Sequence, residues 1–266
     1  MLRHSRPVDE HERSGRLVLD RSGIPARAQV SAVDPAMAHV TVLDGSLVPS
    51  ADHWRRWMGA VADAGYSRVR TGALTSRQAE QASRAELAVV QELVLLELVL
   101  AERPGRNRPG TARPGTGRTA SKRPGTKRLG TRRWDQVAAI DREAFGPRWC
   151  LDATMLDDIT SATPEHRARF VGGSGSRNAD GMVGFLLSGG ADRTGYVQRL
   201  AVSPAAQRQG VAVRLLTDAL AWMHRSRMNR VYVNTDVDNS AALDLYRRFG
   251  FEELPERLRV FEGAVA

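Results

Sequence analysis

The feature that most constrains the fold is a basic segment, rich in proline and glycine, in the middle of the 266-residue chain. This segment runs from Arg103 to Arg133 and contains three copies of Arg-Pro-Gly-Thr, eleven basic residues, no acidic residue and one aliphatic side chain larger than alanine, Leu129. Because it cannot bury a hydrophobic core, we predict a disordered, solvated linker over residues 103–133. The folded structure must then be built from the regions on either side.

The charge of the chain is concentrated in this linker. The net charge of +9 and the isoelectric point of about 10.7 are typical of proteins that bind nucleic acid. Without the eleven basic residues of the linker, however, the chain has 28 basic and 30 acidic residues. Nucleic acid or a ribosome is therefore expected as a partner only through the linker, which lacks the aromatic side chains that stack on bases. We favour a solvated spacer over this role.

Other protein classes are disfavoured by the composition. The one cysteine, Cys150, cannot form an intramolecular disulfide, and no cluster of cysteine and histidine has the spacing of a metal site. The N-terminal residues are charged and lack the apolar core of a signal peptide. The longest apolar run, Leu87 to Leu100, is interrupted by three polar residues. We expect a cytoplasmic protein without a metal or a membrane partner.

Hydrophobic periodicity predicts one small and one larger folded region. Residues 1–30 are expected to be flexible, and residues 31–102 to form a small N-terminal lobe of order βαβαβ. Its predicted helices cover 51–64 and 76–84, and its strands lie around 39–48, 68–71 and 88–98. Residues 134–262 are expected to form the larger lobe, with helices over 134–145, 151–160 and 240–249, an amphipathic helix after 212, and strands at 168–172, 182–189, 195–202, 230–235 and from 251 and 258. This order predicts an α/β (α+β) fold with a mixed sheet.

A loop of the larger lobe carries the clearest chemical signal. After the predicted strand over 195–202, the sequence Gln-Arg-Gln-Gly-Val-Ala occupies residues 207–212 and leads into the amphipathic helix. Gly210 allows the backbone to approach a ligand closely, and the small Ala212 does not block that approach. The free N–H groups of the loop and first helical turn favour a pyrophosphate. The spacing matches neither a Walker A motif nor the dinucleotide-binding fingerprint.

This loop, together with a second motif, resembles the GCN5-related N-acetyltransferase (GNAT) family. Residues 207–212 fit the family pattern Arg/Gln-x-x-Gly-x-Gly/Ala. The family's second pattern, Asn-x-x-Ala-x-x-x-Tyr-x-x-x-Gly-Phe, is matched in register by Asn239, Ala242, Tyr246, Gly250 and Phe251. The resemblance covers about residues 134–262 and implies the GNAT fold, a mixed and mostly antiparallel central sheet flanked by helices.

The resemblance implies an N-acetyltransferase that moves the acetyl group of acetyl-CoA to a primary amine by direct attack. The acceptor is expected to be a protein N-terminal α-amine or a small-molecule amine. In the family, the Val202 N–H would polarise the acetyl carbonyl, and the loop would hold the pyrophosphate. The residues expected to bind acetyl-CoA are Leu200, Ala201, Val202, Gln207, Arg208, Gln209, Gly210, Val211, Ala212, Val213, Arg214, Asn239 and Tyr246.

The resemblance assigns a general acid but no clear general base. Tyr246 is expected to protonate the CoA thiolate as it leaves, the alternative being a tyrosine packed on the sheet. Asn234 stands where family members that acetylate ribosomal-protein N-termini have a glutamate. A water relay held by Asn234, or a carboxylate of Asp236 or Asp238, is an alternative base, although each aspartate also suits a turn.

The acceptor is expected to lie near the loop between the first two helices of the larger lobe. There the sequence Glu-Ala-Phe-Gly-Pro-Arg-Trp, residues 143–149, resembles the aromatic loop that covers the acceptor in several family members. Phe145 and Trp149 are therefore candidate substrate-binding residues. The alternative is that both belong to the hydrophobic core at a helix end.

The N-terminal lobe resembles a degenerate copy of the same fold, as in two-lobed acetyltransferases. The sequence of residues 67–74 is similar to that of residues 229–237. The glycine-containing loop has no counterpart before the helix at 51–64, so no second cofactor site is expected. Two other function classes stay open: a protein tethered to nucleic acid or ribosomes by its linker, and a non-catalytic acyl-CoA sensor.

Overall fold

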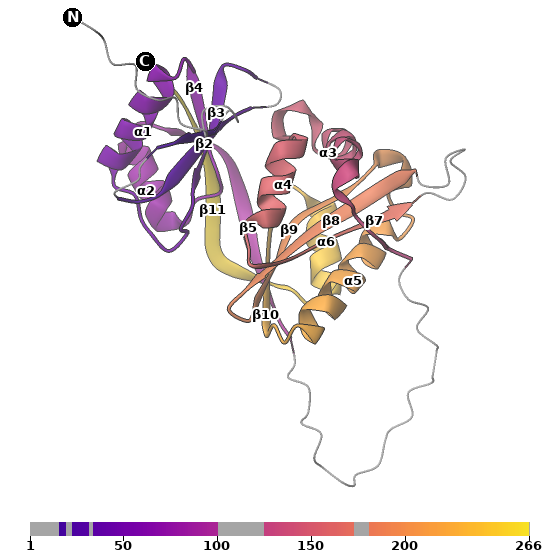
Figure 1. Cartoon of the computed structure of the whole chain (residues 1–266). Helices are drawn as coiled ribbons and strands as arrows, with labels where there is room; N and C mark the ends of the chain where they lie inside the picture. The colour runs from indigo at the N-terminus through magenta and orange to yellow at the C-terminus, as the bar shows by residue number, and fades with distance from the viewer. Residues whose placement is uncertain (1–15, 20–22, 32–33, 101–124, 173–180, 266) are drawn as a thin grey trace, which may run out of the picture. The chain divides into compact units, whose positions relative to one another are not determined.

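The computed structural model describes residues 16–19, 23–31, 34–100, 125–172 and 181–265. Residues 1–15 of the predicted flexible terminus, and residues 101–124, which include most of the predicted linker, lie outside the described residues. The chain divides into two compact units (Figure 1). Unit 1 contains residues 1–95, 234–240 and 253–266, and unit 2 contains residues 96–233 and 241–252.

Unit 1 is a sheet covered by two helices. Its strand order is β1-β2-β3-β4-β11-β5. Strands β2 and β3 are antiparallel, whereas β3 and β4 are parallel and are connected through α1. The elements are β1 (Arg16–Val18), β2 (Ala26–Val30), β3 (Met37–Val42), α1 (Ala51–Asp63), β4 (Arg68–Thr71), α2 (Ser76–Arg84), β5 (Ala88–Val99) and β11 (Glu252–Ala264), and the ends of β5 and β11 extend into unit 2.

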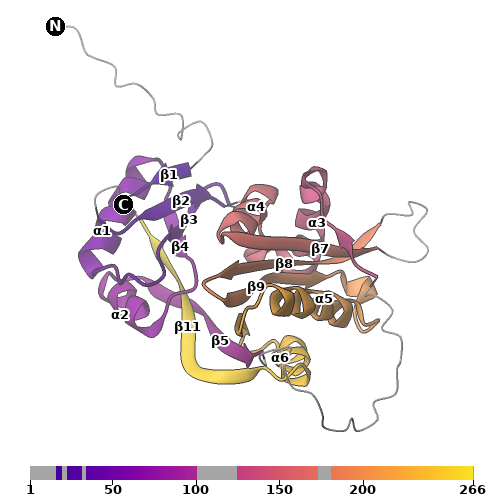
Figure 2. The same cartoon turned by 60° about the horizontal axis from the view of Figure 1, so that its bottom comes forward.

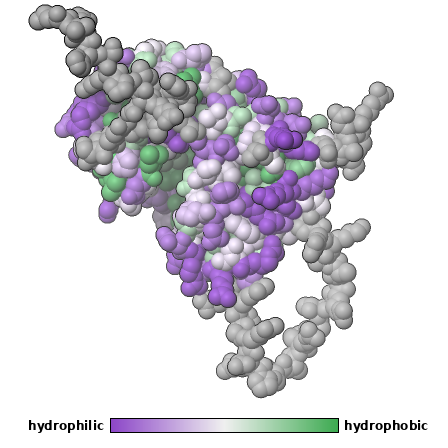
Figure 3. All heavy atoms as spheres, viewed as in Figure 1, coloured by the Kyte–Doolittle hydropathy of each residue, from purple (hydrophilic) through white to green (hydrophobic). Residues whose placement is uncertain are grey.

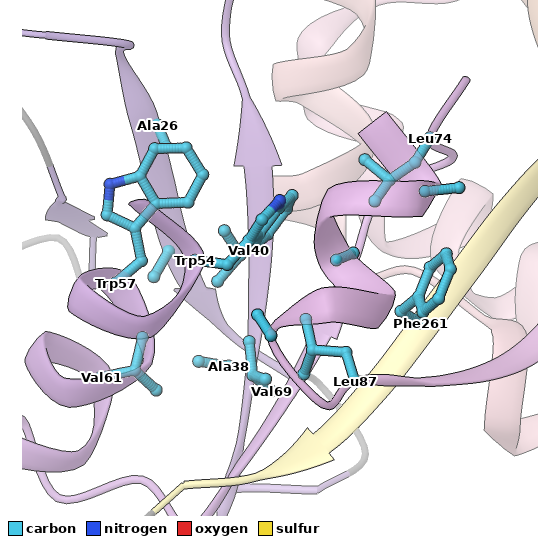
Figure 4. Close-up of a cluster of buried hydrophobic side chains, with 14 residues drawn as sticks. Ala26, Ala38, Val40, Trp54, Trp57, Val61, Val69, Leu74, Leu87 and Phe261 are labelled. Carbon is cyan, nitrogen blue, oxygen red and sulfur yellow. The ribbon is translucent and has the colours of Figure 1, made fainter. Parts of the chain in front are cut away.

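The core of unit 1 forms around two tryptophans of α1. Trp54 and Trp57 lie three residues apart on the same helical face, and their rings meet edge to face with centroids 5.0 Å apart. Figure 4 shows Trp54 beside Val40 of the sheet, and Val69 and Phe261 of β11 belong to the same cluster. The far end of the chain therefore completes this core.

The same strand order continues in unit 2 as β5-β10-β9-β8-β7-β6, so the eleven described strands belong to one hydrogen-bonded sheet. The β7–β8 and β8–β9 pairs are antiparallel, whereas β9 and β10 are parallel and connected through α5. The elements are β6 (Lys127–Arg128), α3 (Trp134–Trp149), α4 (Ala153–Ser161), β7 (Glu165–Gly172), β8 (Met182–Ala191), β9 (Thr194–Val202), α5 (Val211–Arg225), β10 (Arg230–Asp236) and α6 (Ser240–Arg248), with short 3₁₀ turns at Thr131–Arg133 and Pro204–Ala206. Segments of β10 and α6 belong to unit 1.

Helices cover both faces of the β7–β9 sheet. Side chains alternate between the faces of a strand, so Phe185 and Leu187 of β8 pack with α3 and α4, while Gly184 faces Val211 of α5. Figure 2 shows α3 and α4 on one side of these strands and α5 on the other. This sandwich positions the start of α5 above the end of β9.

The structure confirms the predicted fold class and corrects two predicted disordered regions. The sheet is mixed and mostly antiparallel, and the predicted elements at 68–71 and 76–84 have the predicted bounds. Residues 1–30, however, include strands β1 and β2. Residues 125–133 of the predicted linker include β6 and a 3₁₀ turn, because Leu129 is buried in the unit 2 core and its N–H donates to Ala168 O.

The end of the chain also departs from the prediction. The two predicted terminal strands are one strand, β11, and Glu262 and Gly263 pair with Arg70 and Val69 of β4. Most of β11 lies in unit 1, so the compact units are not contiguous in sequence. The domain ranges 31–102 and 134–262 stay a prediction.

The surface of the described residues is mainly hydrophilic in the view of Figure 3, with small hydrophobic patches. No helix in the described part of the chain is both long and apolar enough to cross a membrane.

Candidate functional site

The loop before α5 has a backbone shape that favours glycine. Gly210 is the residue before the first turn of α5 and has φ +74°, in the left-handed region, as has Arg208 with φ +60°. A Cβ on Gly210 would meet no atom within 4 Å, so open space lies over this residue. Glycine is thus required here by backbone conformation and not by a close neighbour in the protein.

The start of α5 offers a set of unused hydrogen-bond donors. Among the described residues, no backbone acceptor pairs with the N–H groups from Arg208 to Val213, and the first bond of the helix is Arg214 N–H to Gly210 O. No side chain caps this terminus, and its first turn has no acidic residue. These N–H groups lie at the positive end of the helix dipole, an arrangement that binds phosphate.

Gly184 of β8 sets how closely α5 approaches the sheet. It lies opposite Val202 in the β8–β9 ladder. A Cβ at this position would lie 2.8 Å from Val211 Cγ1 and 2.9 Å from Ala201 O, which is closer than real side chains come. Only glycine therefore lets the first turn of α5 pack over the end of β9.

A β-bulge in β9 was not foreseen from the sequence. The register passes from Leu187 paired with Arg199 to Ser188 paired with Val197, so Gln198 is the additional residue. Its side chain donates to Ile159 O of α4 at 2.7 Å. The two adjacent polar residues Gln198 and Arg199, which interrupt an otherwise apolar strand, were the available sequence signal.

The bulge coincides with the point where β9 separates from β10. The parallel pairing of these strands ends at Tyr196 with Tyr232, two residues before Gln198. A bulge bends its strand and increases the twist, which explains why the pairing stops there. In the described part of the chain, Val197 and the residues from Arg199 to Val202 have register partners in β8, whereas no residue from Val197 to Val202 has one in β10. The predicted ligand residues Leu200, Ala201 and Val202 all lie on this stretch.

Tyr246 is buried in α6 and packs against the following strand. Its side chain is 4% exposed, and its ring meets that of Phe251 with centroids 5.5 Å apart. Burial raises the pKa of the phenol above its ordinary value. Its oxygen is not among the described polar atoms that are fully enclosed without a hydrogen bond. The raised pKa therefore keeps the phenol protonated at neutral pH.

The polar residues at the end of β10 and directly after it lie in unit 1 and form a turn. Asp236 Oδ1 accepts from Asp238 N–H, and its Oδ2 accepts from Gln91 Nε2 at 2.7 Å. Asn239 N–H donates to Asp236 O, while Asn234 is exposed near the end of the strand. The two aspartates thus fit the turn interpretation, and the roles of Asn234 and Asn239 stay predictions.

The predicted acceptor loop is anchored to β9 by a buried ion pair. The fully buried carboxylate of Asp141 accepts from Arg199 Nε at 2.8 Å and Nη2 at 2.9 Å, and also from Leu151 N–H at 2.8 Å. The Arg199 guanidinium lies 3.6 Å from the centre of the Phe145 ring and donates to Trp149 O.

The helical backbone of α3 is interrupted directly after Phe145, at the predicted end, because Gly146 has the non-helical angles φ +71° and ψ 172°. A further helical segment after this kink extends α3 to Trp149, which was not predicted. Phe145 packs against the unit 2 core, in agreement with the alternative interpretation, whereas its role and that of Trp149 in acceptor binding stay predictions.

A carboxylate that sequence reasoning did not select lies at the end of β9. Glu143 Oε2 accepts from Ser203 Oγ at 2.7 Å, and Ser203 directly follows Val202. The carboxylate comes from α3, sixty positions earlier, so its proximity to β9 depends on the tertiary structure. It is solvent-exposed and able to accept a proton.

The corresponding helix of unit 1 has a different N-terminus. Both α1 and α5 connect a strand to its parallel neighbour. In α1, however, Ser50 precedes the helix with φ −68° and its Oγ accepts from His53 N–H, and Asp52 lies in the first turn. A filled cap and a negative charge both disfavour phosphate.

The site thus combines a mixed α/β fold with a strand edge and a helix terminus suited to a long phosphorylated ligand. No group of three metal-binding side chains occurs among the described residues. Residues 134–251 match the model of the acetyltransferase (GNAT) family. This part of the chain is therefore a GNAT domain, and enzymes of that family use acetyl-CoA as co-substrate.

Curated relatives are similar over short segments. The chain is 38% identical over 63 residues to GCN5-related N-acetyltransferase 6, chloroplastic, of Arabidopsis thaliana, a match that covers 24% of this chain and 22% of that protein. It is 34% identical over 67 residues to N-alpha-acetyltransferase 30 of Saccharomyces cerevisiae, covering 25% of this chain and 38% of that protein. The matched segments thus span less than two fifths of these relatives.

One similar solved structure spans both units. A tandem GNAT protein from the clavulanic acid biosynthesis pathway has a TM-score of 0.59 at 12% identity, over 95% of this chain and 84% of that chain. At this identity the similarity concerns the fold alone.

Proposed function

We propose that the GNAT domain transfers the acetyl group of acetyl-CoA to a primary amine by direct attack. The observation that carries this proposal is the uncapped start of α5, which follows a strand whose last six residues have no partner in β10 among the described residues. The N–H groups from Arg208 to Val213 would hold the pyrophosphate, and the open edge of β9 would pair with the pantetheine arm. Arg214 would add positive charge.

The reaction needs one polarising group and two proton transfers. The amine nitrogen attacks the acetyl carbonyl carbon, and the Val202 N–H stabilises the negative charge on the carbonyl oxygen, an effect worth about 3–4 kcal/mol in other enzymes. The carbon–sulfur bond then breaks. Tyr246 donates its proton to the departing thiolate, and the raised pKa of the buried phenol keeps it protonated until this step.

We propose Glu143 as the group that takes a proton from the acceptor nitrogen, which attacks as the neutral amine. The support is its contact with Ser203, the residue after Val202, whose N–H would polarise the acetyl group. Both carboxylate oxygens of Asp236 are already engaged in hydrogen bonds within its turn. A water relay through Asn234 is the alternative. The acceptor, a protein N-terminal α-amine or a small amine, would approach beside the loop containing Phe145 and Trp149.

We propose further that unit 1 is a degenerate GNAT-like lobe without its own cofactor. The repeated order of an antiparallel pair, a helix and a parallel strand supports a common origin with unit 2. The capped start of α1 and Asp52 in its first turn support the loss of a phosphate site. A scaffold or acceptor-binding role follows. A cytoplasmic location, and a basic linker that acts mainly as a spacer, also remain proposals.

The decisive experiment measures acetyl-CoA binding and thiol release with the full chain. A panel of peptides with different N-terminal residues and of small amines supplies the acceptors. We expect binding without an acceptor, and thiol release only when a suitable amine is present. Tight binding without turnover on any amine would instead support the acyl-CoA sensor. Nucleic-acid binding that disappears when residues 103–124 are deleted, with turnover intact, would restrict that activity to the linker.

A further inference from the structure

A polar pocket lies at the β7 edge of unit 2. Its volume is about 440 Å³, and it is lined by residues of β6, β7, α3, α4 and α5. Strand β6 pairs only with Arg169 and Phe170 of β7, which leaves the earlier part of that edge to the pocket. The α5 residue in the lining, Trp222, follows Val211 by eleven positions, or about 16 Å of helix. The pocket is therefore distinct from the proposed acetyl-CoA site.

The pocket walls carry an excess of positive charge. Arg128, Arg167 and Arg169 all line it. The latter two share one carboxylate, because Asp218 accepts from Arg167 Nη2 at 2.9 Å and lies 3.2 Å from Arg169 Nε. Within the described residues, Arg128 forms no ion pair. The lining itself contains one carboxylate, Asp157, because Asp218 is not among the lining residues. Three guanidinium groups, two of which share Asp218, against one lining carboxylate favour an anionic ligand.

Two enclosed donors in this lining lack an acceptor. Arg167 Nε and Trp134 Nε1 are fully buried and make no hydrogen bond to the described residues. An unsatisfied buried donor costs about 1–3 kcal/mol, so native proteins rarely keep one without a reason. Because both atoms are fully enclosed, a ligand in the pocket would reach them only after a side-chain movement. The argument for an anionic ligand therefore rests on the charge of the lining.

The pocket also contains planar surfaces. The indole rings of Trp134 and Trp222 come from different helices, and the His166 imidazole belongs to the strand between them. Indole and guanidinium groups both stack on flat rings, and guanidinium also recognises phosphate through paired hydrogen bonds. A ligand that combines a planar ring with a phosphate uses both properties.

We propose that this pocket binds a nucleoside monophosphate, with the phosphate on Arg128 and Arg167 and the base against the tryptophans. The same group occurs free and as the 5′ end of a nucleic-acid strand. The chemistry of the pocket is the same for both sources.

The test is a calorimetric titration of the full chain with AMP. Saturating CoA is present throughout, because the proposed acetyl-CoA site could itself bind a nucleotide. We expect AMP to bind under these conditions, and Arg128→Gln and Trp222→Leu each to weaken binding about tenfold, equivalent to about 1.4 kcal/mol. Arg225→Gln, an exposed arginine of α5 outside the lining, is the matched control and should bind AMP as the wild type does.

Further arms separate the ligand sources and the failures. Inorganic phosphate and adenosine should each bind more weakly than AMP. A 5′-phosphorylated oligonucleotide that binds at least tenfold tighter than AMP would assign the strand end, and equal binding would assign the free nucleotide. The proposal is overturned if CoA abolishes AMP binding, if Arg128→Gln binds AMP like the control, or if benzoate, an aromatic carboxylate without phosphate, binds as well as AMP. Circular dichroism of each variant verifies folding.

Discussion

The buried pair of Asp141 and Arg199 should be a major determinant of the stability of unit 2. The Asp141 side chain is 0% exposed and the Arg199 side chain 18% exposed, and three hydrogen bonds reach the carboxylate. Two unit charges about 4 Å apart interact by about 4 kcal/mol at an effective dielectric constant of about 20. Removal of one partner from a buried pair typically destabilises a protein by about 3–5 kcal/mol, because the other charge is left without compensation.

We therefore expect Arg199→Met to lower the free energy of unfolding by about 3–5 kcal/mol. With a urea dependence of about 2 kcal/mol per M, the unfolding midpoint would fall by roughly 2 M. Tryptophan fluorescence during urea unfolding measures this change. The matched control is Arg84→Met, which breaks the exposed pair with Glu80 and should change stability by about 0–1 kcal/mol.

The double variant tests the cause of the loss. Asp141→Asn removes the charge that Arg199→Met leaves unpaired, so the combination should be more stable than Arg199→Met alone. A loss below about 1 kcal/mol for Arg199→Met, equal to the control, would refute the reasoning. Purely additive effects of the two substitutions would show that the pair is not coupled.

Three further results are expected. Tyr246→Phe should lower kcat by about 10²–10⁴ with little change in acetyl-CoA affinity, and equal kcat values would exclude the acid role. As the pH rises above about 10, the wild type should lose more stability than this variant. The reason is that the phenol ionises there in the unfolded chain, while its raised pKa keeps it protonated in the folded protein. Gly210→Ala should destabilise by about 1–2 kcal/mol, through backbone strain alone, and weaken acetyl-CoA binding in calorimetry; unchanged binding would contradict the phosphate site. Glu143→Gln should lower kcat by at least tenfold while acetyl-CoA affinity is kept; unchanged kcat would favour the water relay at Asn234.

Much of the site could be predicted because its signals are local. The left-handed conformation of Gly210 follows from a strand, a turn and a helix within about twenty residues, and the GNAT motifs around it and Tyr246 are contiguous in sequence. The N-terminal helix at 76–84 and strand at 68–71 were likewise found from periodicity alone. Local patterns suffice when the backbone conformation depends mainly on neighbouring residues.

The remaining features depend on pairing between distant residues. Leu129 is buried because its segment pairs with the edge of β7. Strand β11 contributes to the core of unit 1 because it pairs with β4. The bulge at Gln198 is defined by the register between β9 and β8. The sequence of one strand does not show which strand will pair with it, so these features could not be predicted locally.

The sequence by itself thus determined the basic central segment, the alternation of helices and strands, and the strand–loop–helix motif that resembles the GNAT family. The tertiary structure decided where β9 separates from β10, which carboxylate contacts Ser203, and how Asp141 anchors the segment that contains Phe145 and Trp149. The physical reason is that hydrophobic period and backbone preference are properties of neighbouring residues. Register, ion pairing and pocket lining instead arise when segments distant in sequence pack together.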